Sequence, residues 1–438
     1  MNLVLARGCS NSCPYCFETA EREKGKPEFI SMENVAQFAE WARASHLEFL
    51  QLVGGEPFLH PKLANIVTMF REVCPGTRLM LLTGGVFQKR LLEDISPEAV
   101  GLAFNINEPR DYQNPKHFAK VMNNVEIAIR KGFRVVLSFN VWRLDFDTNF
   151  MPAIAHRLAR SNFRWAVANP QRDFPSSVVE PMQYEALAER CFAMLQRAAE
   201  LNIEARLDCP LPLCFFRDSQ LGWVRQYHPG TAERMGCCGV PLDVTPELEV
   251  IRCFALSKLI RVKLTDFANE RELGNWFLAC IEPQLLQRGC FSQCSECRHF
   301  QIGRCYGGCL AWHECAIDPS AQPSAYTLAM GMGEAVDAGK HDLALDQYEK
   351  AIYWTKAVMP TFEAAVDAFR LGKWEQAFRY AAYAQDMAPD PTIKEQVRDL
   401  MKSIPHDDIK TAVCPLPDNP SCQSSSVQAN VEGGVDEH

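Results

Sequence analysis

Three cysteines near the start of the chain, Cys9, Cys13 and Cys16, follow the spacing CxxxCxxC. Three thiolates on so short a loop can bind three corners of a cubane [4Fe-4S] cluster, and the fourth iron is then left without a protein ligand. An iron of this kind can take a chelating molecule from outside the protein. A structural zinc site or a disulfide is the ordinary alternative, but a zinc site closes with four ligands. The spacing therefore favours an open cluster.

A second motif, Gly54-Gly55-Glu56-Pro57, follows the apolar run Phe49–Val53. The two motifs in this order resemble the radical SAM superfamily. The resemblance implies that the amino and carboxylate groups of S-adenosylmethionine bind the open iron of a [4Fe-4S] cluster. It also implies that Gly54, Gly55, Glu56 and Pro57 frame this ligand and that Tyr15 packs beside its adenine.

The composition indicates a folded protein of about three domains, because the chain has 438 residues, of which 47% are hydrophobic. Its 19 cysteines are too few for a disulfide scaffold and suit metal-bound thiolates in a reducing compartment. We find neither a signal peptide nor a run of about eighteen apolar residues, so we expect a cytoplasmic protein without membrane contact. The net charge of −9 disfavours a large basic surface and therefore a nucleic-acid partner.

Short apolar runs alternate with longer amphipathic ones over residues 1–207, which predicts an α/β fold of βα units. Ser31 is a predicted N-cap for a helix that reaches Ala44. The resemblance implies that these units form a partial (βα)6 barrel of the TIM type. The predicted strands are Leu3–Leu5, Phe49–Val53, Arg78–Thr83, Gly101–Ile106, Arg134–Val141 and Arg164–Ala168.

Polar residues at the ends of the fourth and fifth predicted strands are candidates for contact with the ribose and methionine parts of the ligand. The resemblance implies this role for four residues: Asn105, Asn107, Ser138 and Asn140. The alternative, a hydrogen-bonded strand end without a ligand, stays open for each of them. The chain also departs from the family where it has Thr83-Gly84-Gly85 and Asn107-Glu108.

Cysteines crowd the region 208–322, where the helical and strand periodicity weakens. This region resembles the SPASM extension, an irregular domain that carries one or two auxiliary [4Fe-4S] clusters. The resemblance implies one cluster on Cys294, Cys297, Cys305 and Cys315, and another to which Cys238, Cys253 and Cys309 contribute. Either Cys214 or Cys237 could be the fourth ligand of the latter cluster, or its iron could be open to substrate.

The cysteine pattern of this region also allows another interpretation and contains a second CxxxCxxC spacing. A pair of structural zinc sites is the alternative to the clusters, because CxxC pairs alone do not distinguish the metals. Cys290 repeats the CxxxCxxC spacing with Cys294 and Cys297, but we interpret this as coincidence because no strand precedes it and no GGEP follows.

An Ala-rich segment over residues 323–402 shows a period of 33 residues, which predicts all-α tetratricopeptide-like repeats. A plain helical hairpin is the alternative. Residues 403–438 have the composition of a disordered tail. The residues that show the period are Gly339, Ala344 and Ala351, followed by Gly372, Ala377 and Ala384.

The resemblance implies an enzyme that cleaves S-adenosylmethionine reductively to a 5′-deoxyadenosyl radical and modifies a C–H position of a peptide or protein. It implies an electron donor of the flavodoxin or ferredoxin type. Because the first predicted strand begins at once, we expect the repeats or a separate protein to recognise the substrate. The alternatives are an RNA-modifying radical SAM enzyme and a non-enzymatic repeat scaffold stabilised by zinc.

Overall fold

A computed structural model describes most of the first 313 residues and part of the C-terminal region. Clustering of contacts divides the chain into two compact units, Met1–Tyr326 and Thr327–His438, and each is considered by itself below. The described residues are 1–16, 28–169, 178–236, 238–239, 241–277, 281–285, 289–301, 305–313, 365–366, 368–387 and 391–405.

The first unit is built on one sheet, in which seven neighbouring strands run parallel in the order β1-β3-β4-β5-β6-β7-β8. β9 pairs with β1 in parallel and extends the sheet on the other side, where β10 and β11 follow antiparallel. The strands are β1 (Asn2–Arg7), β2 (Glu28–Phe29), β3 (Phe49–Gly54), β4 (Arg78–Thr83), β5 (Gly101–Asn105), β6 (Val135–Val141), β7 (Asn162–Val167), β8 (Glu204–Leu207), β9 (Asp243–Val244), β10 (Glu249–Ile251) and β11 (Val262–Lys263).

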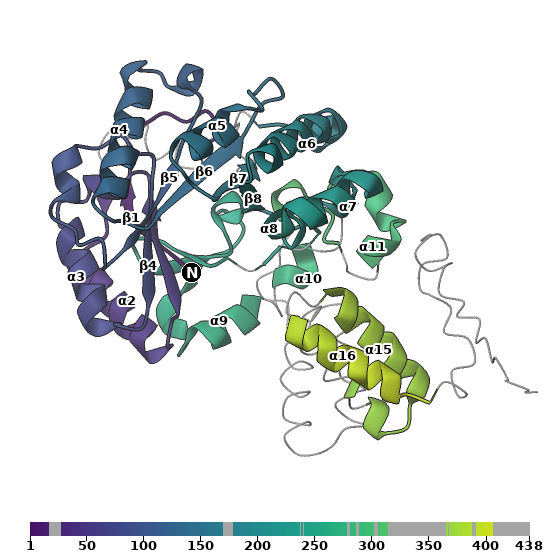
Figure 1. The fold of residues 1–438 in the computed structure, drawn as a ribbon. Helices are drawn as coiled ribbons and strands as arrows, with labels where there is room; N and C mark the ends of the chain where they lie inside the picture. Colours follow the sequence, from purple (N-terminus) through teal and green to yellow (C-terminus); the bar gives the residue numbers. More distant parts are fainter. Residues whose placement is uncertain are drawn as a thin grey trace, which may run out of the picture. The chain divides into compact units, whose positions relative to one another are not determined.

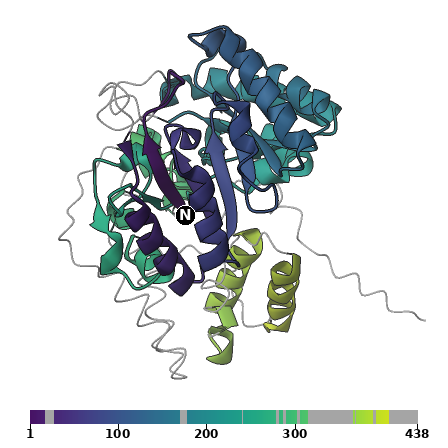
Figure 2. The same ribbon diagram turned by 90° about the vertical axis from the view of Figure 1, so that its left-hand side faces the viewer.

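Helices connect the parallel strands and, as Figures 1 and 2 show, α2 to α6 lie along the outer face of the sheet. α2 begins after Ser31, whose side chain accepts a hydrogen bond from the Asn34 amide, so the predicted N-cap is confirmed. The α-helices of this unit are α2 (Met32–Ala44), α3 (Leu63–Val73), α4 (Lys116–Arg130), α5 (Phe150–Arg157), α6 (Tyr184–Glu200), α7 (Asp218–Tyr227), α8 (Pro229–Ala232), α9 (Glu270–Trp276), α10 (Glu282–Leu285) and α11 (Arg298–Gln301).

The two faces of the sheet differ in composition because successive strand residues point to opposite sides. On β7, Phe163, Trp165 and Val167 belong to the core beneath the helices. The alternate position Arg164 therefore lies on the inner face, and it pairs in register with Ser138 of β6. The outer face supplies the hydrophobic core, and polar residues gather on the inner face.

The six predicted strands are all present, and their bounds agree with the observed ones to within two residues. The prediction of a parallel α/β fold is thus confirmed. The structure adds a further parallel strand, β8, and it joins β9, β10 and β11 of the predicted Cys-rich region to the same sheet. No helix among the described residues is long and apolar enough to cross a membrane.

The second unit contains α15 (Trp374–Met387) and α16 (Pro391–Ser403). Small residues of α15, Ala377, Ala381 and Ala384, are fully buried in a core that also includes Val397 and Ile404. This close packing is what small residues permit between paired helices. Most of the predicted first repeat and of the predicted tail lies outside the described residues, so the repeat architecture stays a prediction.

Glycine is required where β3 ends, because the chain there passes directly against the end of β1. A Cβ atom on Gly54 would lie 2.3 Å from the Ala6 carbonyl oxygen, and Gly54 has a φ of +151°. A Cβ atom on Gly55 would lie 2.1 Å from the Gly8 carbonyl oxygen. Both contacts are with backbone, which cannot rotate away as a side chain can.

We therefore predict that Gly55→Ala lowers the free energy of unfolding by about 3 kcal/mol, because the main chain at Gly8 must move. Gly222→Ala is the matched control: it lies in α7 with open space around the added methyl group, and it should stabilise by about 0.5–1 kcal/mol. Urea unfolding followed by circular dichroism measures both. Equal midpoints for the two variants would contradict the proposed backbone contact.

Candidate functional site

The loop after β1 carries Cys9, Cys13 and Cys16, so all three thiols lie at the edge where the parallel strands end. The Asn11 amide donates to the Cys9 sulfur at 3.3 Å, and the Cys16 amide donates to the Cys13 carbonyl oxygen at 3.1 Å. The loop is thus folded by its own backbone into a compact turn. All three residues are partly accessible to solvent.

The GGEP motif extends the pairing of β1 and β3 beyond the strands themselves. The Gly55 amide donates to the Ala6 carbonyl oxygen at 2.8 Å, and the Glu56 amide donates to the Gly8 carbonyl oxygen at 3.1 Å. Pro57 then occupies the first turn of η1 (Pro57–Leu59), where it loses no hydrogen bond. The motif therefore fixes the start of the cysteine loop.

The Glu56 side chain is fully buried and accepts hydrogen bonds from three donors in two segments. It accepts from the Thr83 hydroxyl at 2.8 Å, from the Gly84 amide at 3.0 Å and from the Phe58 amide at 3.2 Å. Glu56 thus ties the GGEP turn to the end of β4. The sequence marked Glu56 only as part of a ligand frame.

Burial also governs the ionisation of this site. It raises the pKa of Glu56 to about 7, against the lowering effect of the hydrogen bonds from Thr83, Phe58 and Gly84. Burial, together with the nearby Glu56 carboxyl group, raises the pKa of Cys9 to about 12. A bound metal reverses this preference, because it deprotonates its thiol ligands.

A chain of side-chain hydrogen bonds runs from the sheet to the cysteine loop. The Asn140 amide donates to Asn105 at 3.0 Å, and the Asn105 amide donates to the Tyr15 hydroxyl at 2.9 Å. That hydroxyl donates to the Asn107 carbonyl oxygen at 2.5 Å, and the Asn107 amide donates to the Cys13 sulfur at 3.3 Å. Three predicted strand-end residues and Tyr15 are therefore brought together. Stacking of Tyr15 on an adenine stays a prediction.

Ser138 precedes Asn140 by two residues on β6 and pairs in register with Asn105 on one side and Arg164 on the other. The row Asn105-Ser138-Arg164 thus crosses three strands on the inner face. Arg164 is partly buried, and the structure shows no ion pair for it within the described residues. Sequence reasoning missed this cation, although strand alternation from Trp165 would have placed it.

A pocket of about 490 Å³ opens beside the cysteine loop and is lined by Cys13, Tyr112 and Trp142 among others. Two of its lining residues, Arg110 and Arg143, form ion pairs with the buried carboxylate of Glu108, the first at 3.0 Å. These ion pairs hold the two arginines in place. A second pocket of about 390 Å³ shares Trp142 and Arg143 with the first. The two pockets therefore follow one another along the same wall.

The remaining cysteines form two sets, each of which we define by its members. The first set, which we call the Cys294 group, is held close together. The charges of Cys294 and Cys305 help to raise the pKa of both Cys214 and Cys290. The sequence left Cys214 as one of three possibilities for the other cluster and treated the spacing of Cys290 as coincidence. The structure places both near Cys294 and Cys305, and which of them bind a metal stays a prediction. The members are Cys214, Cys290, Cys294, Cys297 and Cys305.

The second set, the Cys238 group, has Cys209 as its unexpected member. The charges of Cys238 and Cys253 help to raise the pKa of both Cys209 and Cys309, so these four thiols lie near one another. Burial, reinforced by these neighbouring charges, raises the pKa of Cys209 and of Cys309 well above the ordinary value. By its solvent-accessible surface Cys209 is nevertheless an exposed residue. The members are Cys209, Cys238, Cys253 and Cys309.

Among the described residues, no three His, Cys, Asp or Glu side chains lie close enough together to bind a single metal ion. The cysteines of each set are therefore further apart than the ligands of one ion. A cubane binds each thiolate at a different iron, so its ligands stand further apart than those of one zinc ion. Two predicted ligands, Cys237 and Cys315, lie outside the described residues.

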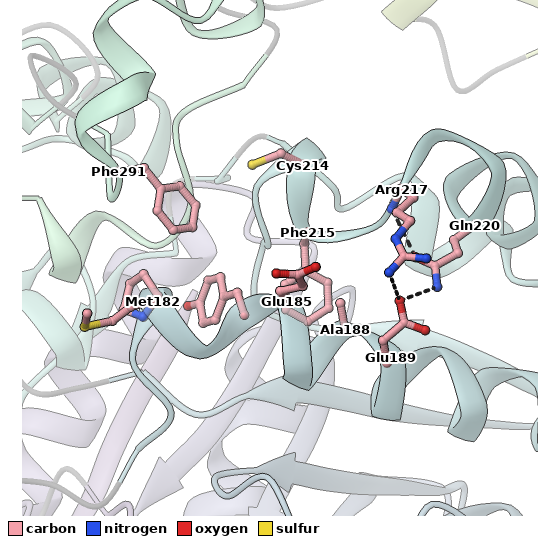
Figure 3. A pocket seen from close by; sticks show the side chains of 11 residues that line it. Met182, Glu185, Ala188, Glu189, Cys214, Phe215, Arg217, Gln220 and Phe291 are labelled. Carbon is pink, nitrogen blue, oxygen red and sulfur yellow. Dashed lines mark hydrogen bonds and ion pairs between the residues drawn. The ribbon is translucent and has the colours of Figure 1, made fainter.

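Cys214 also borders a pocket of about 350 Å³ between α6, η5 (Leu213–Phe215) and α7. Figure 3 shows Met182 and Phe291 at one end and the ion pair of Glu189 with Arg217 at the other. The pocket therefore combines an apolar end and a polar end beside the Cys294 group.

Comparison with known protein families gives a match for the first part of the chain. Residues 3–145 match the model of the Radical SAM superfamily. This part of the chain is a radical SAM domain. The family implies a [4Fe-4S] cluster and S-adenosylmethionine, and the donors of the cysteine loop fit them: three thiols stand on one turn, and amide groups of Asn11 and Asn107 point at their sulfur atoms.

Among curated relatives, a GTP 3′,8-cyclase from Stenotrophomonas maltophilia (strain K279a) is 29% identical over 93 residues, which are 21% of this chain and 28% of the relative. The chain thus spans well under two thirds of that relative. Molybdenum cofactor biosynthesis protein 1 from Bos taurus is matched over 23% of its length, at 24% identity and 31% of this chain.

Solved structures of the same fold cover more of the chain. Native anSMEcpe with bound AdoMet and Kp18Cys peptide has a TM-score of 0.51 at 13% identity, over 78% of this chain and 99% of that one. Streptococcus suis SuiB bound to precursor peptide SuiA has a TM-score of 0.50 at 14% identity, over 71% of each chain. At such identities the likeness concerns the fold.

The raised pKa of Glu56 predicts how the stability of the folded chain depends on pH. Its pKa in the folded chain, about 7, lies above the ordinary 4.5, so the unfolded chain releases this proton first as pH rises. The contribution of Glu56 to stability is therefore complete below pH 4.5 and is lost progressively up to about pH 7, by about 3 kcal/mol in total.

We expect Glu56→Gln to remove this part of the pH dependence, because the amide does not titrate. Urea midpoints at pH 5, 6 and 7 measure it. Glu40→Gln is the matched control, because Glu40 lies exposed on α2. A parent and a Glu56→Gln variant whose midpoints change in parallel over this range would show that Glu56 is charged in the folded chain.

Proposed function

We propose that this protein is a radical SAM enzyme that modifies a C–H position of a peptide or protein substrate. The observation that carries the proposal is the position of the three-cysteine loop: it lies at the ends of the parallel strands, inside a domain that matches the superfamily model. When bound there, the cluster supplies the electron that cleaves S-adenosylmethionine to methionine and a 5′-deoxyadenosyl radical, which takes a hydrogen atom from the substrate.

The protein's own residues would hold and orient the reactants. Cys9, Cys13 and Cys16 would bind the cluster, and Asn107 would orient Cys13 through its hydrogen bond to the sulfur. Asn105, Ser138 and Asn140 provide amide and hydroxyl groups on the inner face for the ligand. Gly54, Gly55, Glu56 and Pro57 would frame its methionine part, with Glu56 acting through the backbone that it holds in place.

The pocket beside Cys13 supports an extended substrate. It is open to solvent and continues past Trp142 and Arg143 to the second pocket near Val179. Such a path suits a chain molecule that presents one residue to the radical. Charged side chains of both signs line it, namely Arg110, Arg143 and Asp145. Arg110 pairs with Asp145, and both arginines pair with the buried Glu108.

The comparisons favour a peptide over a nucleotide. Similarity to the GTP 3′,8-cyclase covers 93 residues, which are 21% of this chain. The structures that cover 71% and 78% of this chain hold peptides, SuiA in SuiB and Kp18Cys in anSMEcpe. Their likeness extends beyond the radical SAM domain, which supports a related use of the Cys-rich region.

We also propose that the Cys294 group and the Cys238 group hold auxiliary [4Fe-4S] clusters of the SPASM type. They would accept the electron that remains on the substrate after hydrogen abstraction, or bind the substrate. A flavodoxin- or ferredoxin-type protein would be the electron donor. The cytoplasmic location remains a prediction of the sequence.

We predict that replacing Cys9, Cys13 and Cys16 together by alanine abolishes 5′-deoxyadenosine formation, because no cluster then binds S-adenosylmethionine. The assay is anaerobic incubation with dithionite and S-adenosylmethionine, followed by chromatography. Cys74→Ala is the matched control, since Cys74 is a buried core thiol that bonds to the Ala39 carbonyl oxygen. Product from the triple variant at the parent's rate would refute the proposed site.

A second prediction concerns metal content. Reconstituted protein should hold about twelve irons per chain, four per cluster, and about four fewer when Cys294 and Cys297 are both replaced by alanine. Iron and zinc analysis of the purified protein measures this. About four irons with two zinc ions in the parent would leave the first site intact and refute the auxiliary clusters.

A further inference from the structure

The side-chain hydrogen bonds between Asn140 and Cys13 all point in one direction. Asn105 accepts from Asn140 at its carbonyl oxygen and therefore directs its amide nitrogen at the Tyr15 hydroxyl, at 2.9 Å. The hydroxyl oxygen is thus an acceptor towards Asn105, and its own proton goes to the Asn107 carbonyl oxygen at 2.5 Å. We call the four residues Asn140, Asn105, Tyr15 and Asn107 the amide relay.

The last hydrogen bond of the amide relay ends on a sulfur atom. Because the Asn107 carbonyl oxygen is occupied by the Tyr15 proton, the amide nitrogen of Asn107 faces the Cys13 sulfur, at 3.3 Å. The Asn11 side-chain amide donates to the same sulfur at 3.6 Å. The Cys13 sulfur therefore receives N–H groups from two side chains, and one of them stands at the end of a polarised chain.

Asn107 is held firmly in the position from which it donates. The amide of the preceding residue, Ile106, donates to the Ser138 carbonyl oxygen at 2.9 Å, which prolongs the pairing of β5 with β6. The Asn107 backbone amide donates to the Tyr112 hydroxyl at 3.1 Å. The Asn107 residue is only 1% exposed, so water does not compete for its bond to the sulfur.

A hydrogen bond to a cysteine sulfur changes how readily an iron–sulfur cluster takes up an electron. Reduction adds negative charge, and an N–H group directed at sulfur stabilises the reduced form. A group that accepts a hydrogen bond also becomes a stronger donor to its next partner. Because the four bonds of the amide relay run the same way, their polarisation accumulates at Cys13.

We propose that the amide relay tunes the redox potential of the three-cysteine site. Asn107 acts through Cys13 as a positioning residue, and the other three members strengthen its hydrogen bond to the sulfur. The inference rests on the proposed radical SAM function and deepens it, because it gives these residues a role before any ligand binds. The relay raises the reduction potential of the cluster, so a weaker reductant suffices to start the reaction.

The proposal depends on position 107 being an amide. Aspartate has the same shape and would still accept the Tyr15 proton, but its second carboxylate oxygen cannot donate to sulfur. It would instead place a negative charge beside a thiolate, which disfavours further negative charge on the cluster. Asn107→Asp therefore reverses the effect on the potential while it preserves the volume of the side chain.

The test is a potentiometric titration of the reconstituted full chain, without S-adenosylmethionine, followed by electron paramagnetic resonance. The signal of the three-cysteine site is the one that changes when S-adenosylmethionine is added to a reduced sample, because that ligand takes the open iron. Asn107→Asp should shift the midpoint potential of this signal to more negative values. Tyr15→Phe should shift it less in the same direction, and Asn140→Ala should shift it least.

This graded order separates a relay from a single hydrogen bond. A shift with Asn107→Asp and none with Tyr15→Phe would overturn the relay, and equal potentials in the parent and in Asn107→Asp would overturn the whole proposal. If Asn107→Asp fails to bind iron, Tyr15→Phe decides, because it removes one oxygen atom and keeps the ring.

Asn124→Ala is the matched control for the loss of a buried amide. Asn124 is also 1% exposed, and its side chain donates to the backbone carbonyl oxygens of Gly85 and Phe87. The variant should leave the midpoint potential unchanged. A shift as large as that of Asn107→Asp would show that loss of packing moves the potential, and it would overturn the proposal.

These outcomes are distinguishable from failure of the proposed function. A parent whose signals do not respond to S-adenosylmethionine would refute that function, and the inference that rests on it would fall with it. A parent that responds and forms 5′-deoxyadenosine, yet titrates at the same potential as Asn107→Asp, would keep the function and overturn the inference alone.

Discussion

The close approach of two backbone segments, the GGEP turn and the end of β1, is the constraint on which the site depends. Gly55 and Glu56 donate hydrogen bonds to Ala6 and Gly8, and this leaves no room for a Cβ atom at Gly54 or Gly55. The cysteine loop begins at Cys9, directly after Gly8. Because Gly8 is hydrogen-bonded to the GGEP turn, the start of the loop is held in place at the end of the sheet.

Buried polar groups then orient the loop from the inside. Glu56 binds the GGEP turn to β4, and the chain of amides from Asn140 to Asn107 ends at the Cys13 sulfur. Hydrogen bonds in a buried environment gain strength from the low local dielectric, and each unsatisfied group would be unfavourable. The polar inner face therefore supports the loop, and it is the surface on which we propose that the ligand binds.

The Cys-rich region obtains its order by other means, because it has little regular secondary structure. Short strands attach it to the edge of the parallel sheet at β1 and β9, and single backbone hydrogen bonds join Leu211, Gly236 and Tyr306. Thiols from distant segments lie near one another there, and the buried Arg252 approaches the Cys238 sulfur at 3.5 Å. The metal centre proposed for this region would also crosslink the segments.

The sequence by itself determined the local features: the strands, the Ser31 cap and the three-cysteine loop, because each depends on residues within one turn or one strand. Spacing along a loop is a short-range property, so Cys9, Cys13 and Cys16 could be read directly. The tertiary structure alone decided that Cys209 lies near Cys238, that Cys214 lies near Cys294 and that Arg252 is buried beside a sulfur. Those outcomes depend on strand register and on backbone contacts across tens of residues, and composition and spacing carry no information about them.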